Sequence, residues 1–130
     1  MIDSSDDLIP VSLLVDGDVV YRYGMVADDF NPIHFDDDAA RALGLPKAIA
    51  HGMIGGALLS RLLADNLGEG WMRRGMLDVK FVRPTFIGET LTARGRARSR
   101  TPLCIDVVVE NDDGQPVIIG EARCPTDEKG

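Results

Sequence analysis

The stretch HGMIGGALLSRLLADNLGEG, residues 51–70, decides the fold class, because its apolar side chains follow the period of an α-helix. The residues that recur at three- and four-residue spacing are Met53, Ile54, Ala57, Leu58 and Leu62. Leu59 and Leu63 lie off that stripe, so apolar side chains occupy nearly every face of the predicted helix. We therefore expect a helix that other structure wraps, ended by Gly68 and Gly70.

Beyond Trp71 the apolar period changes to two, which is typical of β-strands. Four segments follow this pattern, and they are residues 77–81, 91–97, 105–109 and 117–124. A turn at Asp112-Asp113-Gly114 precedes the last one, and the short connections favour antiparallel pairing of consecutive strands. The sequence therefore predicts an α+β fold in which an antiparallel sheet wraps one long central helix.

The N-terminal part of the chain carries shorter signals. Residues 11–15 are typical of a strand or an extended lead-in, and residues 19–27 of a short helix or a strand. Residues 36–43 predict a short helix with acids in its first turn, stopped by Gly44. No repeat or linker divides the sequence, so we expect one domain over residues 1–130.

Composition limits the functional classes. The net charge of −7 argues against a nucleic-acid partner, because phosphate binding needs clustered Lys and Arg. The most apolar run, residues 48–63, is interrupted by His51 and Arg61 and is too short for a bilayer, so no membrane partner is expected. Cys104 and Cys124 lack the spacing of a zinc or redox site. An acidic start where a signal peptide would be basic predicts a cytoplasmic protein.

The stretch ADDFNPIHFDDD, residues 27–38, combines residue types suited to proton transfer. Pro32 stiffens the turn between Asp29 and His34, so a carboxylate and an imidazole can face one small volume and hold a water there. Asn31 with Pro32 supplies the turn signal. These residues alone leave a second interpretation open, a solvated loop with a helix-capping acid.

The second histidine opens the predicted long helix, directly before Gly52. A helix N-terminus presents unpaired N–H groups and partial positive charge, and Gly52 has no side chain to block a ligand carbonyl. The Gly52 N–H could therefore stabilise an enolate-like oxygen. The alternatives are a structural or capping role for His51 and packing room at Gly52.

Together these segments resemble a known family. YGMVADDFNPIHFDDDAARALGLPKAIAHGM, residues 23–53, is similar to the signature region of the MaoC-like, R-specific enoyl-thioester hydratases and dehydratases. The family pattern is matched by Tyr23, Asp29, Asn31, Pro32, Ile33 and His34. FVRPTFIGETL, residues 81–91, resembles the family's strand with Phe-x-x-Pro and a Gly-acid turn, so the likeness runs from about residue 23 to residue 124.

This resemblance implies a hot-dog fold, a curved antiparallel sheet around a long central helix. It implies that Asp29 and His34 are the catalytic pair, that Asn31 positions them, and that the Gly52 N–H is the oxyanion donor. Ser60 matches a family position that hydrogen-bonds near the site, although a helix serine can also bond back to a carbonyl. Besides these residues, Phe30, His51 and Met53 are candidates for contact with the substrate.

The activity implied is reversible hydration of trans-2-enoyl thioesters to R-3-hydroxyacyl thioesters, an enoyl-CoA hydratase or 3-hydroxyacyl dehydratase of fatty acid metabolism. No separate cofactor is implied, because coenzyme A or phosphopantetheine is part of the substrate. Two histidines without clustered ligand spacing also argue against a catalytic metal. The family usually pairs two hot-dog units, so we expect a homodimer or a higher oligomer, with a heterodimer as a further option.

The sequence departs from the family pattern at Ala27-Asp28, where Ser/Thr-Gly is usual. Loss of the glycine could shift the turn, and Asp28 adds a negative charge beside Asp29. We expect the Asp28 side chain to face outward.

Two other functions stay open. A hot-dog thioesterase commonly carries a carboxylate on its central helix, but residues 53–64 contain no acid. A non-catalytic acyl-binding subunit of a heteromeric dehydratase is the third option. Four arginines at alternate positions, Arg94, Arg96, Arg98 and Arg100, could meet the phosphates of coenzyme A or the acidic surface of an acyl-carrier protein, but a solvated strand face is the favoured interpretation.

Overall fold

The computed structural model describes residues 6–125. In chain order its elements are β1 (Val11–Leu14), α1 (Gly17–Ala27), the 3₁₀ helix η2 (Pro32–His34), α2 (Asp37–Ala42), α3 (Gly52–Leu67), α4 (Glu69–Arg74), β2 (Met76–Phe81), β3 (Thr90–Arg100), β4 (Leu103–Glu110) and β5 (Pro116–Cys124). Within the described residues, no helix has the length and apolar character needed to cross a membrane.

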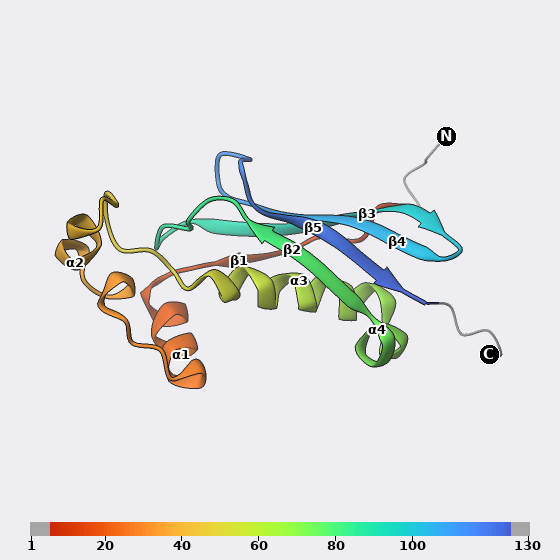
Figure 1. Cartoon of the computed structure of the whole chain (residues 1–130), viewed down its shortest axis with the longest axis horizontal. Coiled ribbons are helices and arrows are strands. Elements are labelled where there is room, and N and C mark those ends of the chain that lie inside the picture. Colours follow the sequence, from red (N-terminus) through yellow and green to blue (C-terminus); the bar gives the residue numbers. More distant parts are fainter. Residues whose placement is uncertain (1–5, 126–130) are drawn as a thin grey trace.

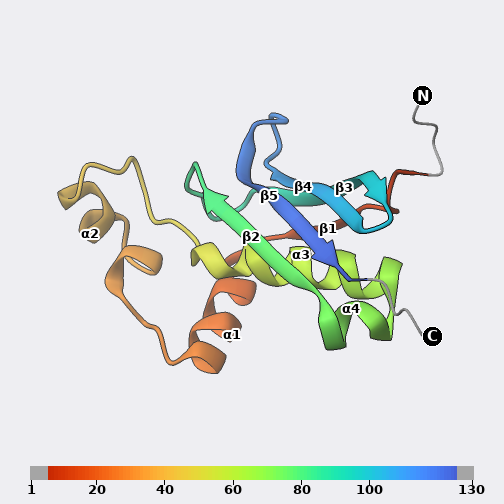
Figure 2. The ribbon, with the colours of Figure 1, turned by 45° about the vertical axis from the view of Figure 1, so that its right-hand side comes forward.

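One antiparallel sheet contains all five strands in the order β1-β3-β4-β5-β2. Helix α3 runs along one face of this sheet, while α1 and α2 lie beyond one end of it (Figures 1 and 2). The predicted α+β plan, with the sheet packed on the long helix, is confirmed. The segments that connect β1 to α3 therefore lie together, at the end of the sheet where α3 begins.

The core lies between α3 and the inner face of the sheet. The buried side chains of the helix are Ile54, Leu58, Leu59, Leu62 and Leu63. Opposite them, β3 and β4 bury the alternating residues Leu91, Ala93, Ala97, Ile105, Val107 and Val109, as their period of two predicts. Helix and sheet approach closely at Gly55, where a Cβ atom would lie 2.7 Å from Cδ1 of Ile118.

Local capping explains where the two N-terminal helices begin. The Asp16 carboxylate accepts a hydrogen bond from the N–H of Val19 at 3.0 Å and caps α1, so the ambiguous segment 19–27 is helical. Asp36 caps α2 in the same way, through the N–H of Asp38 at 2.9 Å. Of the acids in the motif, Asp36 therefore has a structural role.

Three details differ from the sequence-based expectations. Gly68 ends α3, but Gly70 lies within a further short helix, α4. Strand β2 pairs with β5 rather than with its successor β3, because residues 82–89 carry the chain across the sheet. The sheet packs on α3 as expected, but one strip of the helix stays open in the single chain: Met53 is 53% exposed, and Ala57 and Ser60 are also exposed.

Candidate active site

The loop that carries Asp29 begins at the left-handed end of α1. Asp28 has φ 54° and ψ 47°, and it is the one non-glycine residue with positive φ in the described part of the chain. Aspartate tolerates this conformation better than most side chains do, so the chain still makes the turn that a glycine would favour. The Asp28 side chain is exposed, as expected.

Gly24 supports the same loop, although it was not among the residues predicted for the site. Its carbonyl accepts the N–H of Asp29 at 2.9 Å, and a Cβ atom on it would lie 3.0 Å from the Asp29 carbonyl oxygen. The same Cβ would lie 3.1 Å from the Phe30 ring. A glycine one turn before the motif aspartate was the available sequence signal.

Asn31 organises the turn between the two candidate catalytic residues. Its N–H donates to Oδ1 of Asp29 at 3.2 Å, and its own Oδ1 accepts the N–H of Ile33 at 3.2 Å. The N–H of His34 then donates to the Asn31 carbonyl at 3.0 Å, which closes η2. These contacts support the predicted positioning role of Asn31.

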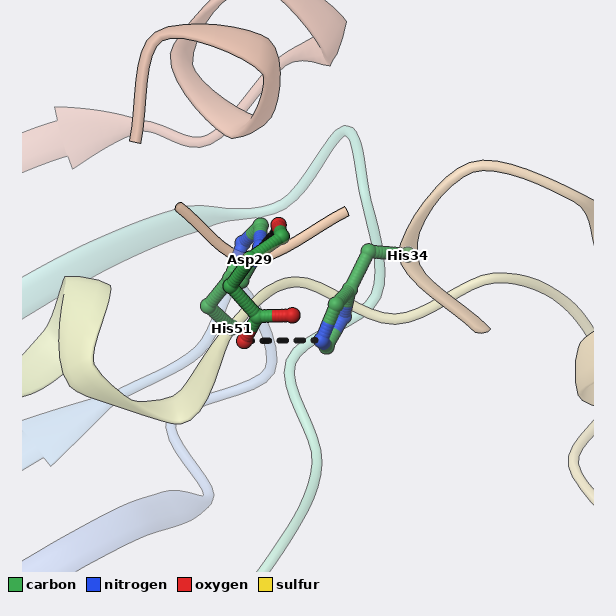
Figure 3. A group of neighbouring side chains, drawn as sticks. All are labelled: Asp29, His34 and His51. Carbon is green, nitrogen blue, oxygen red and sulfur yellow. Dashed lines mark hydrogen bonds and ion pairs between the residues drawn. The ribbon is translucent and has the colours of Figure 1, made fainter. Parts of the chain in front are cut away.

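His34 is 8% exposed, and its ring is oriented by a backbone carbonyl. Nδ1 lies 2.8 Å from the Ile49 carbonyl oxygen, so Nδ1 carries a hydrogen and donates it. In the neutral ring, Nε2 is then the unprotonated nitrogen. It faces Oδ2 of Asp29 at 4.0 Å, the contact drawn as a dashed line in Figure 3.

A separation of 4.0 Å is too long for a direct hydrogen bond between Asp29 and His34. Two hydrogen bonds of about 2.8 Å that meet at one water oxygen span about 4 to 4.6 Å. The Asp29 side chain is 46% exposed, so solvent reaches this gap. The pair can therefore hold one water between a carboxylate and a basic imidazole nitrogen.

His51 contacts both members of this pair and is 4% exposed. Its Nε2 lies 2.9 Å from the backbone carbonyl oxygen of Asp29, so Nε2–H donates to that oxygen. Its ring stacks on the His34 ring, with centroids 3.8 Å apart and 28° between the planes. The side chain makes no capping hydrogen bond to α3.

Gly52 is the first residue of α3, and its N–H donates to no other residue among 6–125. A Cβ atom at Gly52 would lie 3.3 Å from the Phe81 ring, so that ring covers the start of the helix. Gly52 lines a pocket of about 370 Å³ whose other walls are Ile49, Ala50, residues 81–85, Val117 and Ile118. The predicted oxyanion donor is thus unpaired and borders a cavity.

The remaining candidates, Phe30, Met53 and Ser60, are exposed on the surface of the single chain. Phe30 is exposed, and its ring centroid lies 6.0 Å from that of Tyr21 and 5.5 Å from that of Phe35. Met53 and Ser60 lie on the exposed strip of α3, and Ser60 makes no hydrogen bond to another described residue. Within one chain, no contact joins Ser60 to the Asp29–His34 pair.

Asp29, His34 and His51 are the one group of possible metal ligands among residues 6–125, with ligand atoms within 4.8 Å of one another. Bonds of about 2.0 to 2.1 Å place two ligands of a tetrahedral zinc roughly 3.3 Å apart, whereas 4.0 Å requires a nearly linear arrangement. The geometry fits a shared water better than a metal ion.

The fold and the site define a hot-dog protein whose carboxylate–imidazole pair comes from one loop of a single chain. Residues 8–114 match the family model described as MaoC like domain, and the chain belongs to this family. The resemblance found in the sequence and the predicted hot-dog fold are both confirmed.

Relatives of known function are similar over part of their length. An (R)-specific enoyl-CoA hydratase of Aeromonas caviae is 35% identical over 75 residues, 57% of this chain and 55% of the relative. A mitochondrial 3-hydroxyacyl-[acyl-carrier-protein] dehydratase of Arabidopsis thaliana is 24% identical over 86 residues, 65% of this chain and 50% of the relative. The matched segments thus span about half the length of these curated relatives.

Solved structures extend the likeness over the whole fold. The (R)-hydratase from A. caviae involved in PHA biosynthesis aligns with a TM-score of 0.76 at 25% identity, covering 92% of this chain and 93% of that one. The ChsH1–ChsH2 complex of Mycobacterium tuberculosis aligns with a TM-score of 0.77 at 17% identity, covering 98% of both chains. At that identity, the second likeness shows the fold alone.

Proposed function

We propose that this protein catalyses the reversible hydration of trans-2-enoyl thioesters to R-3-hydroxyacyl thioesters. The observation that supports it is the 4.0 Å gap between Oδ2 of Asp29 and Nε2 of His34, open to solvent and matched to one bridging water. The Ile49 carbonyl occupies the other ring nitrogen of His34, so Nε2 is kept available as a base. The family and its hydratase and dehydratase relatives agree with this chemistry.

In the hydration direction, the water held by Asp29 and His34 attacks C3 of the enoyl group. As the C–O bond forms, one water proton passes to the pair, and the pair returns one proton to C2 on the same face. The double bond therefore gains H and OH, and the pair ends in its starting protonation state. Such positioned proton transfer contributes about 10²- to 10⁴-fold to a rate.

The thioester oxygen becomes negatively charged as C3 is attacked. The Gly52 N–H is unpaired within the described chain and lies at the positive end of the 16-residue helix α3. A fixed donor at this position stabilises the enolate oxygen without reorganising when charge develops. The Phe81 ring beside Gly52 shields that oxygen from water on one side.

A hot-dog thioesterase is a weaker candidate on this geometry. Residues 53–64 of the central helix carry no acid, and Asp65 is exposed and paired with Arg61 at 3.5 Å. No helix carboxylate is therefore placed to activate water. A non-catalytic acyl-binding subunit would need no ordered Asp29–His34 pair, which makes this function a weaker candidate as well. One structural neighbour, however, is itself a complex of two named components.

The arginine row of β3 supports no phosphate site. Arg94 donates to Glu110 at 3.0 Å and Arg98 donates to Glu121 at 2.6 Å, and the latter bond raises the pKa of Arg98 above its ordinary value. Arg96 and Arg100 pair with Asp7 and Asp6. These carboxylates favour the solvated-face interpretation, and the choice between coenzyme A and an acyl-carrier protein rests on other residues.

We also expect assembly into a dimer. The open strip of α3 contains Met53 and Ala57, and a neighbouring groove of about 460 Å³ has a mainly apolar lining that includes Tyr23, Val26 and Ile54. Covering this surface would bury apolar side chains that the single chain leaves in water. Light scattering at several protein concentrations measures the assembly directly.

The central experiment measures loss of absorbance by the conjugated thioester on a panel of trans-2-enoyl-CoAs of graded length. Chiral analysis of the product should show the R-3-hydroxyacyl thioester. Thiol release without a change at the double bond would instead identify a thioesterase. A folded protein that acts on no member of the panel, nor on an enoyl acyl-carrier protein, would support the non-catalytic subunit.

A further inference from the structure

One buried side chain contacts both members of the proposed catalytic pair. His51 Nε2–H donates to the backbone carbonyl of Asp29 at 2.9 Å, and its ring lies on the His34 ring at 3.8 Å. Figure 3 shows His51 beside Asp29 and His34, with the Asp29 carboxylate directed toward His34. The Tyr23 ring also contacts His51, with centroids 4.9 Å apart.

We propose that His51 is a positioning residue for the Asp29–His34 pair, a role that rests on the proposed hydratase function. Its Nε2–H holds the Asp29 backbone, and thereby sets the direction of the carboxylate. Its ring supports one face of the His34 ring, whose own Nδ1–H is held by Ile49. His51 thus holds the pair from its buried side, and the side that faces solvent stays free for water and substrate.

The hydrogen-bond pattern of His51 gives it a single working donor. Nδ1 is buried and has no hydrogen-bond partner among the described residues, while Nε2 faces the Asp29 carbonyl. A hydrogen on Nδ1 would be buried without an acceptor, so the neutral ring with its hydrogen on Nε2 fits this position. In this state Nε2–H donates to the Asp29 carbonyl. The buried Nδ1 carries no proton, so it cannot supply one to a substrate.

His51 also links the pair to the third element of the site. It is the N-cap residue of α3, so its backbone leads directly into Gly52, whose N–H is the proposed oxyanion donor. The link from His51 back to Asp29 bridges 22 residues of sequence. One side chain therefore ties the loop that carries the carboxylate to the helix end that carries the N–H.

Two substitutions separate the donor from the ring. His51→Gln keeps an N–H group near the place of Nε2 but removes the ring, and His51→Phe keeps a ring but removes the donor. We expect His51→Phe to lower kcat about 100-fold with KM within threefold of wild type, because small displacements of reacting groups cost about this much. His51→Gln should recover at least tenfold of that loss, on the order expected for restored positioning.

A readout independent of turnover reports the contacts themselves. The chain has only two histidines, so their ring resonances can be assigned from single substitutions. In the wild type, ¹⁵N shifts should show a protonated Nε2 on His51, and the His34 ring protons should be shifted upfield by the stacked ring. That upfield shift should persist in His51→Phe and disappear in His51→Gln.

The control is Ile105→Val, a buried change near the start of β4, beside the β3–β4 connection that Figure 1 shows at the end of the sheet opposite α1 and α2. It should lower the thermal midpoint but leave kcat unchanged. If His51→Phe does not fold, His51→Asn replaces it, because its shorter amide does not reach the Nε2 position.

Three results would overturn the proposal while the wild type hydrates enoyl-CoA. The first is a kcat of His51→Phe within threefold of wild type, and the second is an equal loss of kcat in His51→Phe and His51→Gln. The third is a loss of kcat/KM that comes from a raised KM, which would make His51 a substrate contact. A wild type without hydratase activity would instead refute the proposed function itself.

Discussion

The imidazole rings of His34 and His51 stack with their centroids 3.8 Å apart, although one ends a 3₁₀ helix and the other precedes the long helix α3. Each ring gives one N–H to a backbone carbonyl, His34 to Ile49 and His51 to Asp29. A main-chain carbonyl thereby fixes one nitrogen of each ring, and the stacking of the two rings adds to this. The catalytic proposal depends on this rigidity, since reacting groups must be held to a fraction of an ångström.

Removal of either member of the pair should abolish most of the activity. Asp29→Asn keeps the shape of the side chain but removes its charge, and His34→Ala removes the base. Each should lower kcat by about 10²- to 10⁴-fold. Steady-state hydration of a short trans-2-enoyl-CoA measures the effect, with circular dichroism to show that each variant is folded. Near-normal turnover in either variant would exclude the roles assigned here.

The Gly52 N–H can be tested by a matched pair of substitutions. Both Gly52→Pro and Gly52→Ala place a Cβ near the Phe81 ring, but only proline removes the N–H. Proline is tolerated at the first position of a helix, so the fold should survive. We expect kcat to fall about 10²- to 10³-fold in Gly52→Pro and far less in Gly52→Ala. Equal activities of the two variants would remove the oxyanion role.

Gly24→Ala tests the packing of α1 against the catalytic loop. The new methyl group would lie 3.0 Å from the Asp29 carbonyl oxygen, which is also the acceptor for His51. A displacement of a few tenths of an ångström at this carbonyl should lower kcat by about tenfold. Gly17→Ala in the same helix is the control, because its Cβ would meet nothing within 4 Å. A Gly24→Ala enzyme as active as Gly17→Ala would show that the loop adapts freely.

Asp28 should lower the free energy of unfolding and leave the catalytic rate unchanged. Its φ of 54° lies in the left-handed region, where a Cβ atom costs about 1 to 2 kcal/mol. Asp28→Gly should therefore raise the free energy of unfolding by up to about 1 kcal/mol, after the entropy of the unfolded glycine is subtracted. Asp28→Ala should lower it, and Asp28→Asn should stay near wild type. Urea titrations measure the free energy of unfolding of each variant and so give their order. An alanine variant as stable as the glycine variant would show that the backbone at position 28 is not strained.

The effect of Asp28 on turnover is a separate measurement. Because its side chain is exposed and the turn is already formed, Asp28→Gly should hydrate enoyl-CoA within about twofold of wild type. A larger change, reproduced by Asp28→Asn, would mean that the second negative charge acts on Asp29.

Much of the architecture could be predicted from the residue pattern. The apolar period of residues 51–70 identified the long helix, and strict alternation gave the buried faces of β3 and β4. The turn Asn31-Pro32 was enough to expect Asp29 and His34 near one another. These features follow from local periodicity and from backbone restrictions within a few residues.

Other features required the tertiary structure. The pattern could not show that β2 joins β5, because period two reports which face of a strand is buried but not which strand lies beside it. The open strip of α3 could not be recognised for a similar reason: an apolar surface looks the same in the sequence whether its own chain covers it or leaves it open. His51 contacts the Asp29 carbonyl across 22 residues of sequence, which no short motif encodes.

The sequence by itself determined the helix, the strand faces and the proximity of Asp29 to His34, because these depend on interactions between near neighbours in the chain. Only the tertiary structure decided that His51 faces inward to the Asp29 carbonyl. That contact depends on where the loop after α1 lies relative to the start of α3. That arrangement is set by packing and hydrogen bonds between distant segments, and it determines the geometry of the site.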